Sequence, residues 1–328
     1  MTDIKTLLAY LEPDLVKVRE VVRKSLASDI ELLDKTNESI LSHPGKMMRP
    51  MLAILIAKAC SGGSVKEDSY GFAAASELLH NATLLHDDVA DDSASRRGRP
   101  TVMSILGGRA SVLLGDFWLV KAMDRILDSE KHYAKAIRLF AKTLSDLAEG
   151  EMLQLQKAST GDTTEEDYYR IIYNKTASLF EAAAATAALS VDADSQTADA
   201  MSRFGKDLGI AFQIKDDIFD YDPEAQVGKP VGHDLLEQKI TLPLLGALAN
   251  APEDEAKDIR TMVIKISDDP SLREPIVAFV QKYKGVEYAQ DRLMEFVSKS
   301  VQSLSVLPES QDRDFLEFLA EYTAGRKH

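Results

Sequence analysis

Apolar residues recur every three or four positions along most of the chain, which is the spacing of one face of an α-helix. Pro13 falls inside the first such stretch, between residues 4 and 27, where it marks a break or a kink. The pattern therefore predicts an N-terminal helix or a pair of helices there. The apolar positions of this stretch are Leu7, Leu8, Leu11, Leu15, Val18 and Val22.

Similar periodic stretches cover most of the remaining chain, and turn-forming pairs such as Gly62-Gly63 and Gly107-Gly108 separate them. No run of alternating apolar and polar residues indicates a strand. We therefore predict an all-α fold. Without a repeat of fixed period or a low-complexity linker, one domain over residues 1–328 is the simplest organisation. The helical stretches run through residues 50–60, 69–92, 109–128, 132–158, 165–190 and 195–221, and from residue 240 onward.

The composition suits an ordered helical protein, with 45% hydrophobic and 28% charged residues. A formal net charge of -14 argues against nucleic acid as a partner. Cys60 is the only cysteine, so no intrachain disulfide can form, and a reducing cytoplasm fits. No segment approaches the roughly 20 apolar residues of a transmembrane helix. We expect a soluble, cytoplasmic protein.

Two clusters of aspartates share the spacing D-D-x-x-D. A helix turns residues three and four apart onto one face, so the carboxylates of each cluster should converge. Two unscreened carboxylates about 4 Å apart repel by about 1 kcal/mol in water, and by more in a cleft. One run of charges usually marks a solvated helix face, but two copies of this spacing favour cation binding. The clusters consist of Asp87, Asp88, Asp91 and Asp92, and of Asp216, Asp217 and Asp220.

The ligands in these clusters are all carboxylate oxygens, which suit Mg²⁺ completed by water and phosphate oxygens. We predict that more than one Mg²⁺ ion binds with a diphosphate at Asp87, Asp88, Asp91, Asp216, Asp217 and Asp220. Arginine can also grip phosphate oxygens with two hydrogen bonds. The basic residues that we expect to contribute to phosphate binding are Lys46, Arg49, Arg96, Arg97, Lys229 and Lys239.

The ordered set of motifs over about residues 40–245 resembles the all-trans polyprenyl diphosphate synthase family. One departure is visible, because Pro44 and Met47 stand where the family commonly has glycine and a basic residue, although Lys46 and Arg49 remain. The motifs are Gly45-Lys46-x-x-Arg49-Pro50, His80, His86-Asp87-Asp88-x-x-Asp91-Asp92, Arg96-Arg97-Gly98, Lys175-Thr176, Phe212-Gln213, Asp216-Asp217-x-x-Asp220 and Gly228-Lys229.

This resemblance implies a large helical bundle around a central cavity, as in isoprenoid synthases, and a homodimer. It implies that an allylic diphosphate ionises, that isopentenyl diphosphate attacks the resulting cation, and that a proton is lost before the cycle repeats. Transient membrane contact during product release is also expected. A class I terpene cyclase and a non-catalytic regulatory subunit of a heteromeric synthase remain the alternatives.

The resemblance also implies roles for single residues. Thr176 and Gln213 would face the reacting allylic carbon, whereas His86 would be an ordinary helix residue or a contact behind the metal ligands. Isopentenyl diphosphate would bind separately to Lys46, Arg49, His80 and Arg97, and Lys229 and Lys239 would also contact substrate. The implied catalytic residues are Asp87, Asp88, Arg96, Lys175, Thr176, Gln213 and Asp216.

The length of the product should depend on the helix that carries Asp87. Ala82 lies five residues earlier, about 7.5 Å along the helix axis. Short-chain members of the family tend to have a bulky aromatic residue there or one position later, whereas this chain has Ala82 and Thr83. We therefore expect a long-chain product of the octaprenyl or solanesyl type, as used for quinone side chains.

Overall fold

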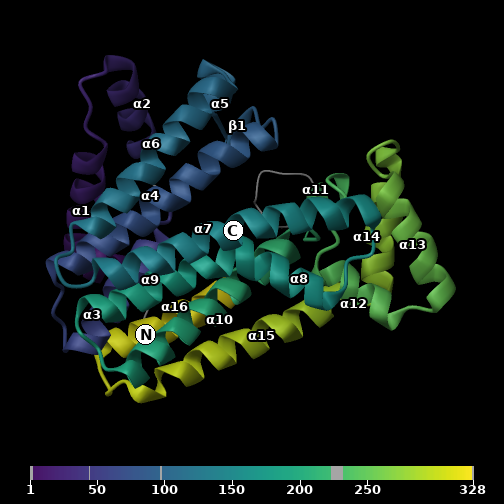
Figure 1. Cartoon of the computed structure of the whole chain (residues 1–328). Helices are drawn as coiled ribbons and strands as arrows, with labels where there is room; N and C mark the ends of the chain where they lie inside the picture. Colours follow the sequence, from purple (N-terminus) through teal and green to yellow (C-terminus); the bar gives the residue numbers. More distant parts are fainter. Residues whose placement is uncertain (1–2, 44, 97, 223–231, 327–328) are drawn as a thin grey trace. The chain divides into compact units, whose positions relative to one another are not determined.

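The computed structural model describes residues 3–43, 45–96, 98–222 and 232–326, and Figure 1 shows the path of the chain. Helices form almost all of the regular structure in these ranges, which confirms the all-α prediction. Two short strands, β1 (Ser95–Arg96) and β2 (Arg99–Pro100), pair antiparallel with Arg96 opposite Arg99. In the described part of the chain, no helix is both long and apolar enough to cross a membrane.

Tertiary contacts group the chain into two compact units, each assembled from segments that are far apart in sequence. Four helices contribute residues to both units: α7 (Tyr133–Thr160), α9 (Ser178–Ser190), α10 (Ser195–Phe219) and α16 (Gln311–Gly325). One domain over residues 1–328 stays a prediction. The first unit consists of Met1–Ala141, Leu179–Gly205 and Leu304–Phe318, and the second of Lys142–Ser178, Lys206–Ser303 and Leu319–His328.

The core of the first unit forms around two long helices that lie side by side, α4 (Glu67–Ala90) and α6 (Gly108–Leu127) (Figure 1). Helices α1 and α3 also pack on α4. Every residue of α3 from 50 to 57 is buried, so this helix is covered on all sides. Burial of each large aliphatic side chain contributes about 1.5–3 kcal/mol. The other elements of this unit are α1 (Ile4–Leu26), α2 (Glu31–Leu41), α3 (Met48–Ser61), α5 (Val102–Leu106) and a 3₁₀ turn at Leu304–Val306.

The second unit is built around the contact between α12 (Leu242–Asn250) and α15 (Gly285–Ser303). A Cβ at Gly285 would lie 2.0 Å from the carbonyl oxygen of Pro243, and one at Gly246 would lie 2.6 Å from the ring of Tyr288. Only glycine therefore lets the two helices approach so closely. The remaining elements are α8 (Glu165–Ile172), a π-helical segment (Tyr173–Ala177), α11 (His233–Leu236), α13 (Glu253–Lys265), a 3₁₀ turn (Pro270–Leu272) and α14 (Arg273–Lys282).

Helix α4 ends two residues earlier than the sequence pattern predicts. Asp91 is its C-cap, and the backbone N–H of Asp91 donates to the carbonyl oxygen of Asp87 at 2.9 Å. Asp92 follows with a left-handed backbone, at a φ of 47°. Aspartate is a poor helix former that tolerates this conformation, which explains why the helix stops inside the first aspartate cluster.

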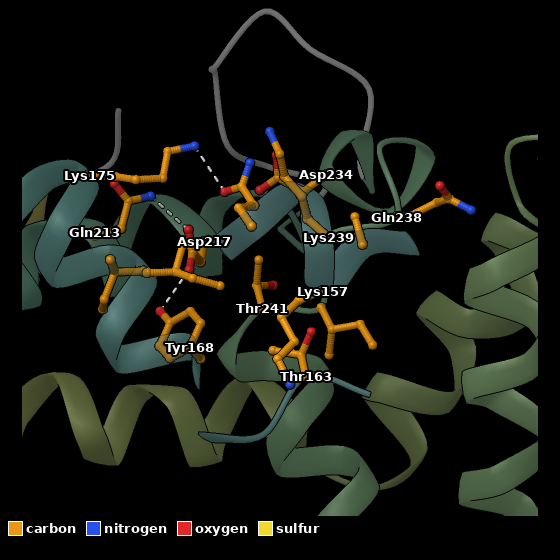
Figure 2. Close-up of a pocket in the computed structure, with 15 residues that line it drawn as sticks. Lys157, Thr163, Tyr168, Lys175, Gln213, Asp217, Asp234, Gln238, Lys239 and Thr241 are labelled. Atoms are coloured by element: carbon orange, nitrogen blue, oxygen red, sulfur yellow. Dashed lines mark hydrogen bonds between the residues drawn. The ribbon is translucent and has the colours of Figure 1, made fainter. Parts of the chain in front are cut away.

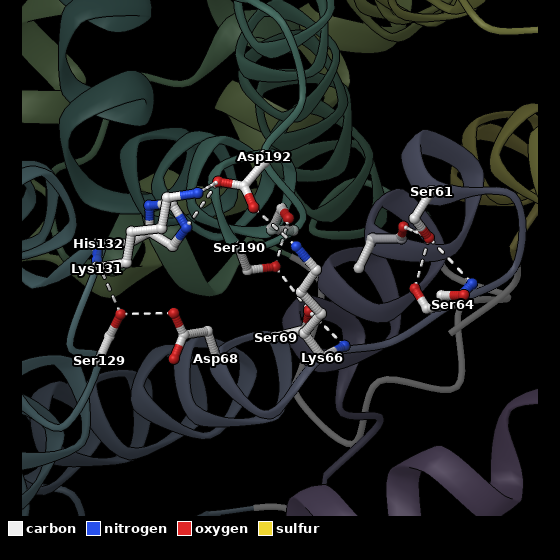
Figure 3. A network of polar contacts seen from close by, with 12 residues as sticks. Ser61, Ser64, Lys66, Asp68, Ser69, Ser129, Lys131, His132, Ser190 and Asp192 are labelled. Atoms are coloured by element: carbon white, nitrogen blue, oxygen red, sulfur yellow. Dashed lines mark hydrogen bonds and ion pairs between the residues drawn. The ribbon is translucent and has the colours of Figure 1, made fainter.

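Three loops of the first unit are joined at Asp192, which follows α9 (Figure 3). Its carboxylate accepts from Lys66 at 2.8 Å and also binds Lys131, while the Nε2 atom of His132 lies 3.2 Å away. Lys66 precedes α4, and the other two residues lie between α6 and α7. The hydrogen bonds from Lys131 and Lys66 hold the pKa of Asp192 well below its ordinary value.

Candidate active site

The first aspartate cluster lies at the C-terminal end of α4. Asp88 is buried there, and its Oδ1 accepts a hydrogen bond from Nε of Arg96 at 2.8 Å. Arg96 comes from β1, so the strand pair brings a predicted phosphate-binding residue back to a predicted metal ligand. Asp87 is partly exposed and Asp91 is exposed. The positive charge of Arg96 offsets the repulsion among these carboxylates.

Three of the residues predicted to bind isopentenyl diphosphate are described, and all three belong to the first unit. Lys46 is exposed, whereas Arg49, on the first turn of α3, places its guanidinium 4.6 Å from the centre of the Phe180 ring. His80 lies on α4 and is partly exposed. Arg97 lies outside the described residues. Convergence of these side chains on one diphosphate stays a prediction.

The residues predicted to limit product length are both on α4, as expected. Ala82 is buried, with 1% of its surface exposed. Thr83 is partly exposed, and its hydroxyl donates to the carbonyl oxygen of His80 at 2.8 Å. His86 approaches Asp116 on α6 through its Nε2 atom, at 3.3 Å. The role of His86, as an ordinary helix residue or as a contact behind the metal ligands, stays a prediction.

The second aspartate cluster lies at the C-terminal end of α10, and one of its carboxylates accepts a hydrogen bond at each oxygen (Figure 2). Asp217 is 3% exposed, and its Oδ2 accepts from the hydroxyl of Tyr168 at 2.7 Å. Its Oδ1 accepts from Nε2 of Gln213 at 2.9 Å. The Oε1 of Gln213 accepts in turn from the hydroxyl of Thr176 at 2.7 Å. The structure thus joins three predicted residues and Tyr168, which the sequence analysis did not single out.

Burial raises the pKa of Asp217 to about 8, and the neighbouring Asp234 adds to this shift. The hydrogen bonds from Tyr168 and Gln213 act in the opposite direction, because they stabilise the ionised carboxylate. The negative charges of Asp234 and Asp216 thus add to the effect of burial in opposing the ionisation of Asp217, and a nearby cation would favour it.

The other two aspartates of this cluster have different partners. Asp216 forms an ion pair with Arg326 at 2.7 Å. Arg326 is buried, donates to the carbonyl oxygen of Phe212 at 2.8 Å, and lies 4.0 Å from the centre of the Phe212 ring. Asp220 accepts from the backbone N–H of Asp234 at 3.1 Å, so it holds the start of α11. No local sequence signal links Arg326 to a motif more than 100 residues earlier.

A cavity of about 150 Å³ lies beside Asp217 within the second unit (Figure 2). The predicted residues Lys175, Gln213 and Lys239 line it together with Asp217. Lys229, which was also predicted to contact substrate, lies outside the described residues. The remaining residues that line the cavity were not predicted. These are Gln154, Lys157, Ala158, Thr163, Tyr168, Ile171, Ile172, Asp234, Gln238, Ile240 and Thr241.

Lys175 reaches this cavity from the π-helical segment, a type of helix that is often found at functional sites. Its ammonium group lies 2.7 Å from an oxygen of Glu151 and donates to Gln154 at 2.9 Å, both on α7. Gly150 makes this approach possible, since a Cβ there would lie 2.7 Å from Cβ of Asn174. The local geometry therefore depends on a glycine in the middle of α7.

The residues present fit a hard divalent cation that binds together with a diphosphate. Among the residues that the structure describes, no three side chains of the usual metal-binding types converge closely enough to hold an ion alone. Mg²⁺ does not require such a cage, because it keeps several waters and is completed by substrate phosphates. The oxygen-only donors and the negative charge around Asp217 suit that kind of site.

Comparisons with known proteins agree with these features. The sequence profile of the family described as Polyprenyl synthetase matches residues 30–278. The octaprenyl diphosphate synthase of Escherichia coli (strain K12) is 37% identical to this chain, over 95% of the chain and 96% of that enzyme. A short chain isoprenyl diphosphate synthase of Methanothermobacter thermautotrophicus is 35% identical, over 94% and 95%.

A solved structure extends the likeness to the fold. It is a polyprenyl synthase from Caulobacter crescentus CB15, complexed with calcium and isoprenyl diphosphate. This chain matches it with a TM-score of 0.90 and 31% sequence identity, over 99% of this chain and 98% of that one. The match therefore extends over both units.

Proposed function

Because the chain belongs to the polyprenyl synthetase family, we propose that the residues around Asp217 bind the diphosphate of an allylic substrate. Enzymes of this family are prenyltransferases that condense isopentenyl diphosphate with allylic diphosphates. The observation that carries the proposal is the cavity in which Lys175, Gln213 and Lys239 lie beside the second aspartate cluster. Cationic and amide donors beside carboxylates are what a metal-bound diphosphate requires.

The reaction consists of three chemical steps. The bond between the allylic carbon and oxygen breaks, and its electron pair leaves with the diphosphate. The double bond of isopentenyl diphosphate then attacks the allylic cation and forms a carbon–carbon bond. Loss of a proton restores a double bond in the product, which is longer by one five-carbon unit. Repetition gives an all-trans polyprenyl diphosphate.

Several residues have proposed roles in the first step. The ammonium group of Lys175 would exchange its contacts with Glu151 and Gln154 for the leaving diphosphate. The hydroxyl oxygen of Thr176 would face the cation, with the amide of Gln213 beside it, because oxygen dipoles stabilise positive charge without trapping it. Lys239 and Lys229 would contact diphosphate, and Arg96 would assist at the first cluster.

Mg²⁺ would neutralise the charge that builds up on the leaving diphosphate. The ligands that we propose are Asp87, Asp88 and Asp91 of the first cluster and Asp216 and Asp220 of the second. The relative that was solved with calcium and isoprenyl diphosphate supports a divalent ion beside an isoprenoid diphosphate. Isopentenyl diphosphate would bind without metal at Lys46, Arg49, His80 and Arg97.

The product that we propose is long-chain, of the octaprenyl or solanesyl type. Relatives named for octaprenyl diphosphate and for short-chain products are almost equally similar, so the proposal depends on Ala82 and Thr83. We also propose a cytoplasmic homodimer, with transient membrane contact when the apolar product leaves. The exposed apolar residues of α6 support the dimer.

The test is incubation of the purified protein with Mg²⁺, farnesyl diphosphate and labelled isopentenyl diphosphate. A synthase should place label in diphosphates of at least eight five-carbon units, and chelation of the metal should abolish this. A terpene cyclase would instead release an unlabelled hydrocarbon, and a regulatory subunit would leave both substrates unchanged. Either of the last two results would contradict the proposal.

A further inference from the structure

Asp217 is the most buried aspartate of its cluster, and both of its oxygens accept hydrogen bonds. Tyr168 occupies Oδ2 and Gln213 occupies Oδ1, at 2.7 and 2.9 Å. Only 3% of its surface is exposed. By contrast, Asp216 and Asp220 are both partly exposed. Asp217 is therefore the member of the cluster whose carboxylate is least able to turn toward an ion.

The hydrogen bonds that end at Asp217 have a fixed direction. The amide nitrogen of Gln213, which can only donate, faces Oδ1 of Asp217. The amide oxygen of Gln213 must then face Thr176, whose hydroxyl has to donate its only proton to it. The carboxylate of Asp217 thus determines how the amide of Gln213 is oriented, and through this amide it determines how the hydroxyl of Thr176 is oriented.

This direction matters for the chemistry at Thr176. With its proton engaged by Gln213, the hydroxyl oxygen can offer only lone pairs to its other neighbours. Lone pairs stabilise an allylic cation, whereas a hydroxyl proton pointing at it would destabilise it. If the direction of these hydrogen bonds were reversed, the hydroxyl proton of Thr176 would be free to point at the substrate. That arrangement would be unfavourable once the allylic cation has formed, although every residue near the substrate would be the same.

We propose that Tyr168 and Asp217 are positioning residues that fix the direction of this hydrogen-bonded chain, and that Asp217 acts through Gln213 and Thr176 without binding metal itself. This inference rests on the proposed function, because it assigns Thr176 to the cation. Tyr168 is as buried as Asp217, and its hydroxyl holds the carboxylate on the side away from Gln213. Without that hydroxyl, the carboxylate loses one of its two anchors.

Tyr168→Phe tests the proposal, and Tyr169→Phe is its matched control. The rings of the two tyrosines are neighbours, with centres 5.4 Å apart, but Tyr169 packs on Phe296 and does not line the cavity. We expect Tyr168→Phe to lower kcat about tenfold, while the KM for isopentenyl diphosphate changes less than about twofold. Tyr169→Phe should retain the wild-type kcat. Thermal unfolding of both variants checks that the fold is kept.

Asp217→Asn is the second variant, because an amide of the same size can reverse the chain. We expect kcat to fall at least as far as in Tyr168→Phe, and the double variant to be no worse than Asp217→Asn alone, since both act through one chain. Binding of Mn²⁺ in the presence of inorganic diphosphate, followed by the free-ion electron paramagnetic resonance signal, gives a readout without turnover. Asp217→Asn should keep the wild-type number and affinity of bound ions.

Three results would overturn the inference: a wild-type kcat for Tyr168→Phe, additive losses in the double variant, or loss of a bound Mn²⁺ ion in Asp217→Asn. None of them would affect the proposed function, which is judged by label incorporation with the wild-type protein. If the wild-type protein incorporated no label, the proposed function would fail. In that case the ion count in Asp217→Asn would still decide whether Asp217 binds metal.

Discussion

Arg326 gives Asp216 a positive partner inside the protein. Its guanidinium is almost fully buried, stacks on Phe212 and reaches the carboxylate at 2.7 Å, while Asp216 itself is about 40% exposed. Hydrogen bonds to charged groups contribute about 1.5–3 kcal/mol, and exposure of Asp216 places this pair near the lower end. The same carboxylate is a proposed Mg²⁺ ligand. Either the arginine or the metal ion should therefore be able to compensate the negative charge of Asp216.

We therefore expect Arg326→Leu to lower the free energy of unfolding by about 2 kcal/mol in metal-free buffer. Addition of Mg²⁺ with inorganic diphosphate should reduce that loss, because the ion then compensates Asp216. Urea unfolding with and without the ion measures both effects. Arg326→Lys, which keeps the charge but loses the flat stacking surface, should show a smaller metal effect. An equal loss in both buffers would show that metal does not reach Asp216.

Ala82 offers a test of product length that also reports on packing. If an elongation tunnel runs beside it, Ala82→Phe should shorten the products found by mass spectrometry and leave the melting temperature almost unchanged. If the side chain is instead packed in a solid core, the added ring should cost about 1–3 kcal/mol of stability and leave product length unaltered. Ala278→Phe, at an exposed position of α14, controls for the added aromatic surface.

The sequence predicts the charged residues of the site better than it predicts the residues that form hydrogen bonds with them. The repeated aspartates and the lysines stand out by spacing, and Lys175, Gln213, Asp217 and Lys239 line one cavity as a result of the fold. Tyr168 could not be recognised in the same way, because buried tyrosines are common in helical cores. Its role depends on which helices pack together, and spacing along the chain carries no such information.

The π-helical segment that carries Lys175 depends on its contact with α7. A Cβ at Gly150 would lie 2.7 Å from Cβ of Asn174 and 3.0 Å from Cγ of Lys175, so neither helix can keep its position when a methyl group is added. Glycine inside a helix costs about 1 kcal/mol relative to alanine. Its presence at the middle of α7 therefore indicates that close packing is worth more than helix propensity there.

Gly150→Ala should lower both stability and kcat, because overpacking of about 1–3 kcal/mol exceeds the gain in propensity and displaces Lys175. Gly71→Ala is a matched control in α4, where the nearest atom to an added Cβ is 3.7 Å away. That variant should gain up to about 1 kcal/mol and keep full activity. Urea unfolding and steady-state kinetics measure the pair, and a stabilised, fully active Gly150→Ala would contradict the packing argument.

The junction of loops at Asp192 should make a pH-dependent contribution to stability. Its folded pKa lies below the ordinary value of 3.8, so the stabilisation is present above about pH 4 and disappears as the pH falls through the folded pKa. The difference in melting temperature between wild type and Asp192→Asn should thus be largest near neutral pH and shrink in acid.

The helical elements follow from the apolar periodicity, with informative exceptions. Helix α1 continues through Pro13, and α2 (Glu31–Leu41) was not predicted, because charged and polar side chains interrupt its short apolar pattern. The predicted helix over residues 165–190 contains the π-helical segment. This segment is a single turn long, too short for its different period to show in the apolar pattern.

The proposed homodimer has a candidate surface on α6. Leu113, Val120 and Leu127 are spaced seven residues apart, which places them on one face of the helix. Their exposed fractions are 60%, 57% and 53%. Scattered exposed leucines are normal, but a stripe along 15 residues is typical of a surface that another molecule covers. A second copy of this chain is the occupant that a twofold axis would supply.

Val120→Glu should therefore convert the dimer into a monomer, since a buried charge facing its own symmetry mate repels it. Leu32→Glu is the matched control, because Leu32 on α2 is 62% exposed but does not belong to the α6 stripe. Sedimentation equilibrium over a range of concentrations should give a monomer for Val120→Glu and a dimer for Leu32→Glu and wild type. If Val120→Glu remained dimeric, the interface would have to lie elsewhere. If the wild type sedimented as a monomer at all concentrations, the dimer itself would be wrong, and each chain would have to complete its own catalytic site.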